Sequence, residues 1–386
     1  MNYNNPYKNN STVAIRVMCA IVFVVFSFAW LFWFQPDVLM MAQHVLSGGL
    51  THYNRLIGAV IITFSLFILQ LLVFSVLRLK KRTHALTYLP SFLLLAVISD
   101  VSHAPDGTIT HGHSWWLILF LLLLWGGIVF VARMAQEVED DADYRLFSRP
   151  MWINMLTMVV LIIILAWIGN TNAVFHYRMA AERHLLEGDE EGALKAGRKS
   201  LESDEHLLML RMYALARQGK LGEKLFEYPI TGTSSEMLPT DSLSQVLMYP
   251  VDSIYRFIGA RPVGKMVPMR YLELVAQKDS LPRQAVFDYI LCGYLIDKKI
   301  DRFASEVGRY YTFNDSVDSL PKHYREALTL YTHLRAHPVL VYHHAVTDED
   351  YDNLQELEKQ YPNPTERKGK VEDQYRGTYW YYYKYE

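Results

Sequence analysis

Five long apolar runs lie within the first 170 residues, and they constrain the fold more than any other feature of the sequence. A helix needs about 20 apolar residues to cross a bilayer core, and a helix pairs its own backbone hydrogen bonds, as lipid requires. The sequence therefore predicts five transmembrane helices. For a short run such as the third, a buried core helix is the alternative. The runs are Thr12–Phe34, Leu56–Leu77, Ala85–Val101, Trp115–Ala132 and Met151–Gly169.

Charge divides the chain near Asn170. The first 170 residues hold 10 Lys and Arg and 8 Asp and Glu, out of 38 and 40 in the whole chain. The mean hydropathy of +0.04 therefore averages a lipid-soluble part and a water-soluble part. We expect a disordered N-terminus over residues 1–11, a transmembrane domain over residues 12–170 and a water-soluble domain over residues 171–386. The net charge of −2 gives no basic field for nucleic acid, so no nucleic-acid partner is expected.

Basic residues predict the orientation, because cytoplasmic loops of membrane proteins carry an excess of Lys and Arg. With the N-terminus in the cytoplasm, Arg55 is the one basic residue in the two outer loops. An odd number of spans then places the water-soluble domain on the outer side. The nine basic residues of the inner flanks are Lys8, Arg16, Arg78, Lys80, Lys81, Arg82, Arg133, Arg145 and Arg149.

Residues 171–386 predict an all-α fold of repeated helices. Apolar residues recur at helical spacing from Phe175 onward, and turns at Gly188 and Gly219 lie 31 positions apart, close to the 34-residue tetratricopeptide period. Segment 181–226 thus resembles two degenerate tetratricopeptide (TPR) units. Later helices are expected at residues 243–258, 263–278, 282–298, 300–311, 321–337 and 348–360.

The C-terminus carries six tyrosines and Trp380 between Tyr375 and Tyr385. Two interpretations are open. The rings form either an aromatic surface for stacking on sugar, peptide or lipid, or an amphipathic helix that caps the repeat stack. The cap is favoured, because the last helix of a helical stack must be closed off from water.

The chain also resembles an uncharacterised family of polytopic inner-membrane proteins from Bacteroidota, which carry a C-terminal tetratricopeptide-like helical domain. The resemblance rests on three segments, ALARQGKLGEKLFEYPITGTSSEMLP, VLMYPVDSIYRFIGA and DQYRGTYWYYYKY. It implies a bacterial inner-membrane protein with its C-terminal domain in the periplasm. The family implies no activity and no catalytic residues.

The second outer loop contains the densest group of polar side chains. Neutral imidazoles and carboxylates are suitable metal ligands, but their spacing here matches no closed zinc motif, so neither metal nor cofactor is expected. Asp37 in the first outer loop joins Asp100 as a weak catalytic candidate. The weak metal candidates are His103, Asp106, His111 and His113.

Two functions of different classes follow. The favoured one is a membrane-anchored helical scaffold that binds a protein or peptide on the outer face of the inner membrane, with the lipid bilayer as its other partner. The rival is a polytopic membrane enzyme, similar in layout to glycosyltransferases that use lipid-linked sugars, with its site on the outer loops. Because nucleotide-binding, hydrolase and metalloprotease motifs are absent from the sequence, a non-enzymatic role is favoured.

Overall fold

The computed structural model describes residues 6–386, except 80–81, 105–107, 114, 136–148, 241–244, 260, 263, 279–283 and 313–319. It is almost entirely helical and divides into two compact units, Met1–Asn172 and Ala173–Glu386. We call them the N-terminal unit and the C-terminal unit. Asp106 lies outside the described residues. A helix already begins at Pro6, within the segment expected to be disordered.

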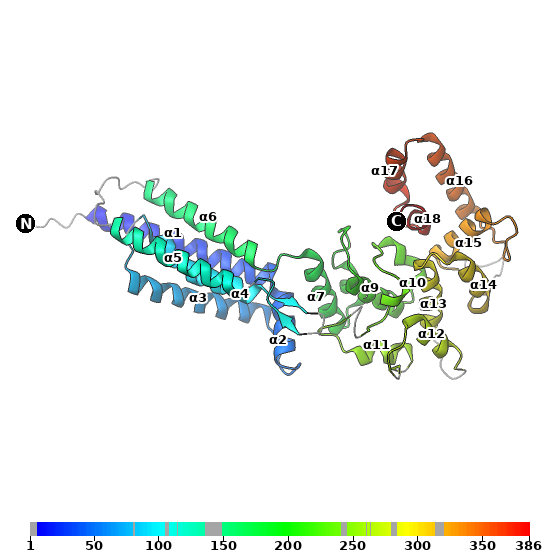
Figure 1. Ribbon diagram of the computed structural model, residues 1–386, viewed down its shortest axis with the longest axis horizontal. Helices are drawn as coiled ribbons and strands as arrows, with labels where there is room; N and C mark the ends of the chain where they lie inside the picture. The colour runs from blue at the N-terminus through cyan, green and yellow to red at the C-terminus, as the bar shows by residue number, and fades with distance from the viewer. Residues whose placement is uncertain are drawn as a thin grey trace, which may run out of the picture. The chain divides into compact units, whose positions relative to one another are not determined.

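The N-terminal unit is a bundle of long apolar helices (Figure 1). Four of them are long and apolar enough to cross a membrane. The first, α1 (Pro6–Ala29), continues into a π-helical turn, η1 (Trp30–Phe34), before the short α2 (Pro36–Leu46). The other three are α3 (Arg55–Leu77), α5 (Trp115–Ala135) and α6 (Arg149–Ile168).

The prediction of five transmembrane helices is wrong at the third run. The chain forms a 3₁₀ turn, η2 (His84–Tyr88), and then α4 (Leu89–Ser99). Its 16 residues would measure about 24 Å as an α-helix, against a bilayer core of about 30 Å. Most side chains of α4 are buried in the bundle, whereas only a minority of those on each of the four long helices is buried. The third run is therefore apolar because it is a helix buried in the core of the bundle, which was the alternative interpretation.

Side chains of neighbouring helices satisfy the irregular backbone at the start of this short helix. The Ala85 amide donates to Asn154 Oδ1 at 2.7 Å, and Trp125 Nε1 donates to the Leu86 carbonyl at 2.8 Å. Further along, Ser91 Oγ donates to the Leu66 carbonyl at 2.9 Å. At the other end, the Asn170 amide donates to the Ser99 carbonyl. The segment therefore runs beside α6 from Asn154 to its end.

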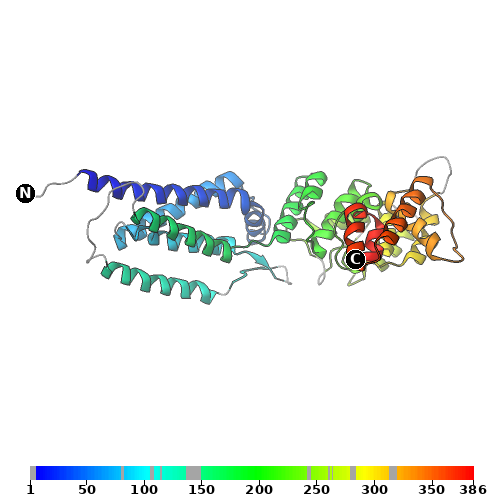
Figure 2. The same ribbon diagram turned by 90° about the horizontal axis from the view of Figure 1, so that it is seen from above.

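By contrast, α5 lies at the edge of the bundle (Figure 2). Val129 is its one buried residue among those described, and a Cβ on Gly126 or Gly127 would meet no atom within 4 Å. Trp125 gives this helix its hydrogen bond to the turn before α4. Exposed apolar side chains on such a helix are compatible with surrounding lipid.

The C-terminal unit is all-helical in its described residues, with twelve α-helices (Figure 1). They are α7 (Ala173–Leu186), α8 (Glu190–Lys195), α9 (Glu205–Arg217), α10 (Leu221–Lys224), α11 (Val251–Ile258), α12 (Pro268–Ala276), α13 (Gln284–Ile296), α14 (Ile300–Tyr310), α15 (Lys322–Leu334), α16 (Ala345–Gln360), α17 (Pro364–Tyr375) and α18 (Tyr379–Tyr385).

Segment 181–226 contains glycine turns at the two positions that the sequence predicts. Gly188 and Gly219 have φ angles of 74° and 66°, a left-handed conformation that favours glycine over any residue with a Cβ. However, α8 has six residues and α10 has four. A tetratricopeptide unit pairs two helices over 34 residues. The helical stack is therefore present, but the assignment to that repeat type stays a prediction.

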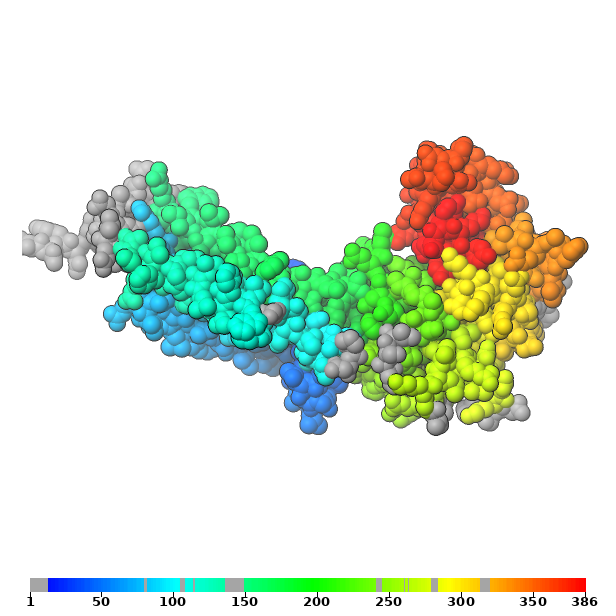
Figure 3. Space-filling view, viewed as in Figure 1, coloured from blue at the N-terminus to red at the C-terminus, as the bar shows by residue number. Residues whose placement is uncertain are grey.

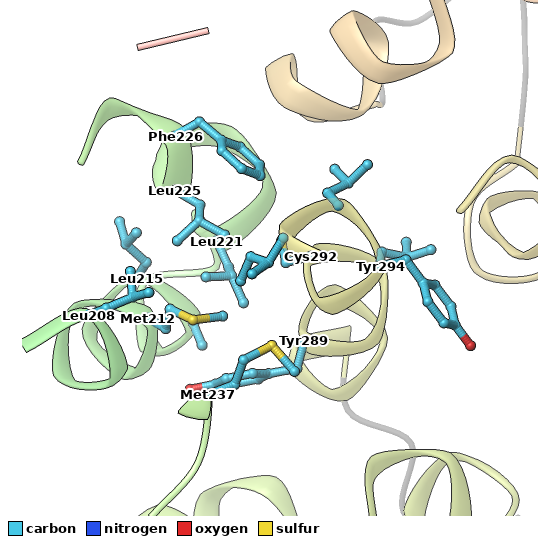
Figure 4. Packing of buried hydrophobic residues seen from close by; sticks show 14 of the residues in the cluster. Leu208, Met212, Leu215, Leu221, Leu225, Phe226, Met237, Tyr289, Cys292 and Tyr294 are labelled. Atoms are coloured by element: carbon cyan, nitrogen blue, oxygen red, sulfur yellow. The ribbon is translucent and has the colours of Figure 1, made fainter. Parts of the chain in front are cut away.

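The core of the C-terminal unit forms where α9, α10 and α13 meet (Figure 4). Met212 and Leu215 on α9 lie opposite Tyr289 and Cys292 on α13, and Leu221 of α10 fills the space between them. Cys292 is fully buried, and burial raises the pKa of its thiol. The other cysteine, Cys19, is buried in the N-terminal unit.

One buried carboxylate explains why the helix expected from residue 243 begins only at Val251. Glu182 Oε2 accepts the backbone N–H groups of Leu247, Met248 and Tyr249 at 2.9, 2.6 and 3.2 Å. These amides are therefore not available for helical bonds. The other carboxylate oxygen of Glu182 lies 3.4 Å from Arg178 Nε, and both side chains are almost fully buried.

Candidate functional site

The predicted polar cluster surrounds a small β-hairpin between α4 and α5. Strands β1 (Ser102–His103) and β2 (Ile109–Thr110) pair antiparallel, with Ser102 opposite Thr110 and His103 opposite Ile109. The hairpin thus places His103 on one strand, while His111 and His113 follow the other. Asp100 precedes it directly at the end of α4.

Asp100 holds the residues that follow β2, at the base of the hairpin, through its carboxylate. Its Oδ1 accepts the Gly112 amide at 3.0 Å, and its Oδ2 accepts the His113 amide at 2.9 Å. His111 Nδ1 lies 2.9 Å from the Asp100 carbonyl oxygen. Asp100 is only 5% exposed, and a Cβ on Gly112 would lie 2.8 Å from Oδ1. The structure therefore brings Asp100, His111 and His113 together, and it uses the carboxylate to close a loop.

The other candidates do not join this group. Asp37 lies in the first turn of α2, where a carboxylate is favoured by the helix dipole. His103 lies on β1, and Asp106 is outside the described residues. In the part of the chain that is described, no three His, Cys, Asp or Glu side chains are placed to hold a metal ion.

The two loops that the sequence predicts on the outer side meet through Asn170, which sequence reasoning did not single out as a site residue. Its carbonyl accepts Gln35 Nε2 at 2.8 Å, and its side chain donates to the Val101 carbonyl at 2.6 Å. Gln35 follows η1 and Val101 follows α4, so one asparagine joins the ends of three helices. This junction fixes one end of the bundle.

A second candidate lies in the C-terminal unit, in the connection between α15 and α16. Residues 338–344 lie outside any helix, with bends at residues 339 and 340 and none over residues 341–344, and Leu340 and Tyr342 pack on the core. Val339 and Val341 point outward and are 85% and 57% exposed. Residues near 340, orange in Figure 3, form part of the visible surface. We call residues 338–344 the exposed segment.

Contacts at both ends of the exposed segment fix its conformation. The Val339 amide donates to the Tyr331 hydroxyl at 3.1 Å, and the His344 amide donates to Asp348 Oδ2 at 3.2 Å. Between them, the structure records no hydrogen bond for the Val341 and His343 amides with any described residue. In an extended chain these two residues present their N–H and C=O groups to the same edge. The Val341 and His343 amides of the exposed segment are thus without a hydrogen-bond partner among the described residues.

The aromatic C-terminus is a cap, as the favoured interpretation predicts. Tyr379, Trp380, Tyr381 and Tyr382 of α18 are all buried. Tyr382 also donates from its hydroxyl to the Ile296 carbonyl at 2.6 Å. These four rings are therefore not available for stacking on a ligand.

Glu326 on α15 is the main polar anchor of the cap. Its Oε2 accepts the Tyr379 amide at 2.7 Å, and its carbonyl accepts Trp380 Nε1 at 2.7 Å. The same Oε2 lies 2.9 Å from His323 Nδ1. Because His323 Nε2 accepts the Phe226 amide, the ring proton belongs on Nδ1 and points at Glu326.

We predict that Asp100→Ala lowers the free energy of unfolding by about 1–3 kcal/mol, because two amides of the hairpin lose their acceptor. Asp100→Asn keeps one acceptor oxygen and should show an intermediate loss. Thermal unfolding of the full chain in detergent micelles measures both. Unchanged stability in Asp100→Ala, together with a complete loss of cellular activity, would instead indicate a chemical role for this carboxylate.

We predict that Glu326→Ala releases the C-terminal cap. It leaves two buried donors, the Tyr379 amide and His323 Nδ1–H, without an acceptor, and each costs about 1–3 kcal/mol. Limited proteolysis of the full chain should then cut near Gly377 much faster. Glu358→Ala is the matched control, since Glu358 binds Lys384 and Tyr385 at the surface and its loss should cost less. Equal cleavage of both variants contradicts the anchor role.

Comparison with known proteins gives one result. A family model described as "Family of unknown function (DUF6057)" matches residues 266–386. No curated protein and no solved structure matches the chain. The matched region runs from just before α12 to the end and so contains both the exposed segment and the cap. The family description names no organism and no repeat type, so the resemblance to Bacteroidota membrane proteins stays a prediction.

Proposed function

We propose that this chain is a membrane-anchored scaffold whose C-terminal unit binds an extended segment of a partner protein. One observation carries the proposal, namely that the backbone amides of Val341 and His343 in the exposed segment have no hydrogen-bond partner among the described residues. An exposed strand edge offers backbone hydrogen bonds to an incoming strand, and its outward side chains select the sequence that binds. Val339 and Val341 are apolar, so the partner strand presents apolar side chains to them.

The position of the exposed segment supports this role. Leu340 and Tyr342 pack on the core, and hydrogen bonds at Val339 and His344 hold both ends. A partner strand therefore meets a segment that is already ordered, and little conformational entropy is lost on this side. Surface loops usually lack such support and expose polar side chains instead.

The enzyme alternative receives no comparable support. Its weak catalytic candidates were Asp37 and Asp100. Asp100 closes the hairpin with both carboxylate oxygens, and Asp37 lies in the first turn of α2. A general acid or metal ligand needs a carboxylate that can reach a substrate or an ion.

The proposal also includes the orientation in a bacterial inner membrane, with the N-terminus in the cytoplasm and the C-terminal unit in the periplasm. The unequal distribution of Lys and Arg supports this orientation. Four long helices alone would return the chain to its starting side. The buried segment His84–Ser99 is not itself a lipid-facing span, but it lies inside the bundle beside α6, from Asn154 toward Asn170, and so returns the chain from the end of α3 toward the start of α5.

We predict that a photoreactive amino acid at Val341 in native membranes crosslinks to one partner protein. The same substitution at Val267, which is equally exposed at 58%, should not. Val341→Pro removes the free amide and should reduce recovery of that partner roughly tenfold, the effect of about 1.4 kcal/mol. Val341→Ala keeps the amide and should reduce recovery less.

The paired variants separate backbone pairing from side-chain contact. Equal crosslinking from Val341 and Val267, or full recovery of the partner with Val341→Pro, contradicts the strand-addition proposal. Because the Val341 amide has no partner among the residues that the structure describes, its loss should leave the fold intact, and thermal unfolding of the purified variant checks this.

Orientation is predicted separately. A reporter enzyme that is active only in the periplasm should be active when fused after Glu386 and inactive when fused between α5 and α6. The reverse pattern, with both fusions expressed at equal levels, overturns the orientation without affecting the strand-addition proposal.

A further inference from the structure

An apolar groove of about 430 Å³ opens between α1 and α3 on the surface of the N-terminal unit. These two helices pack side by side in the bundle (Figure 1). The groove extends from the η1 end of α1 toward the middle of both helices. Its lining includes Val25, Phe28 and Trp33 from the first helix, and Val60, Thr63 and Phe64 from α3.

Thr63 is the one polar side chain that lines this groove. It is only 6% exposed, and its hydroxyl has no hydrogen-bond partner among the described residues. That hydroxyl is itself buried and is not open to the groove, so the accessible wall of the groove is almost wholly apolar and suits a hydrocarbon chain.

Arg55 lies at the rim of the same groove, at the start of α3. Its guanidinium stacks on the Phe32 ring at 4.2 Å, and its Nε donates to the Phe32 carbonyl. Phe32 in turn stacks on Phe28 and meets Trp33 edge to face, and both of these residues line the groove. The two terminal amino groups of the exposed Arg55 make neither of these contacts, so they remain available at the rim of the groove.

The lining favours a lipid chain over another helix as the occupant. Transmembrane helices pack closely where small residues let their backbones approach. Phe28, Trp33 and Phe64 are bulky and would hold a second helix away. A flexible hydrocarbon chain fills such an irregular space, and the cation at the rim selects the charge of its headgroup.

We propose that the groove binds an anionic phospholipid. One acyl chain lies between α1 and α3, and the phosphate pairs with Arg55. Arginine matches a phosphate with two parallel N–H donors, which a point charge does not provide.

The charge distribution makes Arg55 decisive for this site. It is the one Lys or Arg between residues 35 and 77 and also the one in the two predicted outer loops. No neighbouring cation in this part of the sequence can replace it as a partner for the headgroup. Binding should therefore depend on this single guanidinium, unlike the general attraction of anionic lipid to a polybasic surface.

The test uses the full-length chain in phosphatidylcholine nanodiscs with a small share of a photoreactive phospholipid. The probe carries a diazirine in its acyl chain and has either a phosphatidylglycerol or a phosphatidylcholine headgroup. After illumination, mass spectrometry of peptides locates the label. The phosphatidylglycerol probe should label the α1 and α3 peptides that line the groove. The phosphatidylcholine probe should label them more weakly.

Variants with matched controls make the result decisive. Arg55→Gln should reduce groove labelling by the phosphatidylglycerol probe roughly tenfold, the loss of one charge-assisted pair, whereas Arg55→Lys retains part of it. Arg133→Gln, an exposed arginine on α5, should leave labelling unchanged. Val60→Trp should fill the groove and abolish labelling, while Val131→Trp on the exposed face of α5 should not. Thr63→Val, which removes a hydroxyl that is not open to the groove, should leave labelling unchanged.

The proposal fails if the label spreads evenly over the exposed faces of α1, α3 and α5. It also fails if the two headgroups label the groove equally, or if Arg55→Gln matches the unchanged chain. Each outcome is independent of partner binding by the C-terminal unit, because the site and the exposed segment lie in different units.

Discussion

The hydrogen bond from the Ala85 amide to the Asn154 side chain secures the turn on which the N-terminal unit depends. A chain inside a bilayer must pair every backbone N–H and C=O within the protein. The 3₁₀ turn before α4 departs from a regular helix, so α5 and α6 supply Trp125 and Asn154 as partners. Once this turn is satisfied, a short helix can lie inside the bundle, and the longer helices can surround it and face lipid.

Buried backbone groups must also be paired in the C-terminal unit, which has the composition of a water-soluble domain. Glu182 and Glu326 are buried carboxylates, and each accepts backbone amides from segments far away in the sequence. Glu182 orders the loop before α11, and Glu326 orders the start of α18. Removal of either carboxylate would leave buried donors unpaired, and such donors cost more than the bonds contribute. Specific polar anchors therefore hold the irregular parts of this helical stack.

Local patterns predicted most of the fold. Helices α13, α14 and α15 begin and end within a few residues of the positions expected, because apolar periodicity and the proline before α15 are properties of the segment itself. The prediction of a transmembrane helix at the third apolar run was wrong, because composition does not distinguish a helix buried by its neighbours from one exposed to lipid. The helix expected from residue 243 starts late because Glu182, more than sixty residues earlier, binds its amides.

The candidate sites were predicted less well, for the same reason. Asp100, His111 and His113 do come together, but the role of Asp100 depends on two amides that only the folded hairpin brings to it. The exposed segment has no recognisable pattern, since Val339 to Tyr342 are all apolar. Which of these residues face solvent is decided by the packing of Leu340 and Tyr342 on the core. The Arg55–Phe32 contact likewise joins residues 23 positions apart.

Both natural cysteines are buried, one in each unit, and the raised pKa of Cys292 keeps its thiol protonated at neutral pH. Maleimides and methanethiosulfonates react with accessible thiolates, so the unmodified chain should react with them very little. Labelling of a single cysteine introduced in any loop would then report on that position alone. Spin labels, fluorophores and membrane-impermeant alkylating reagents can thus be attached one position at a time, without first removing a native residue from either core.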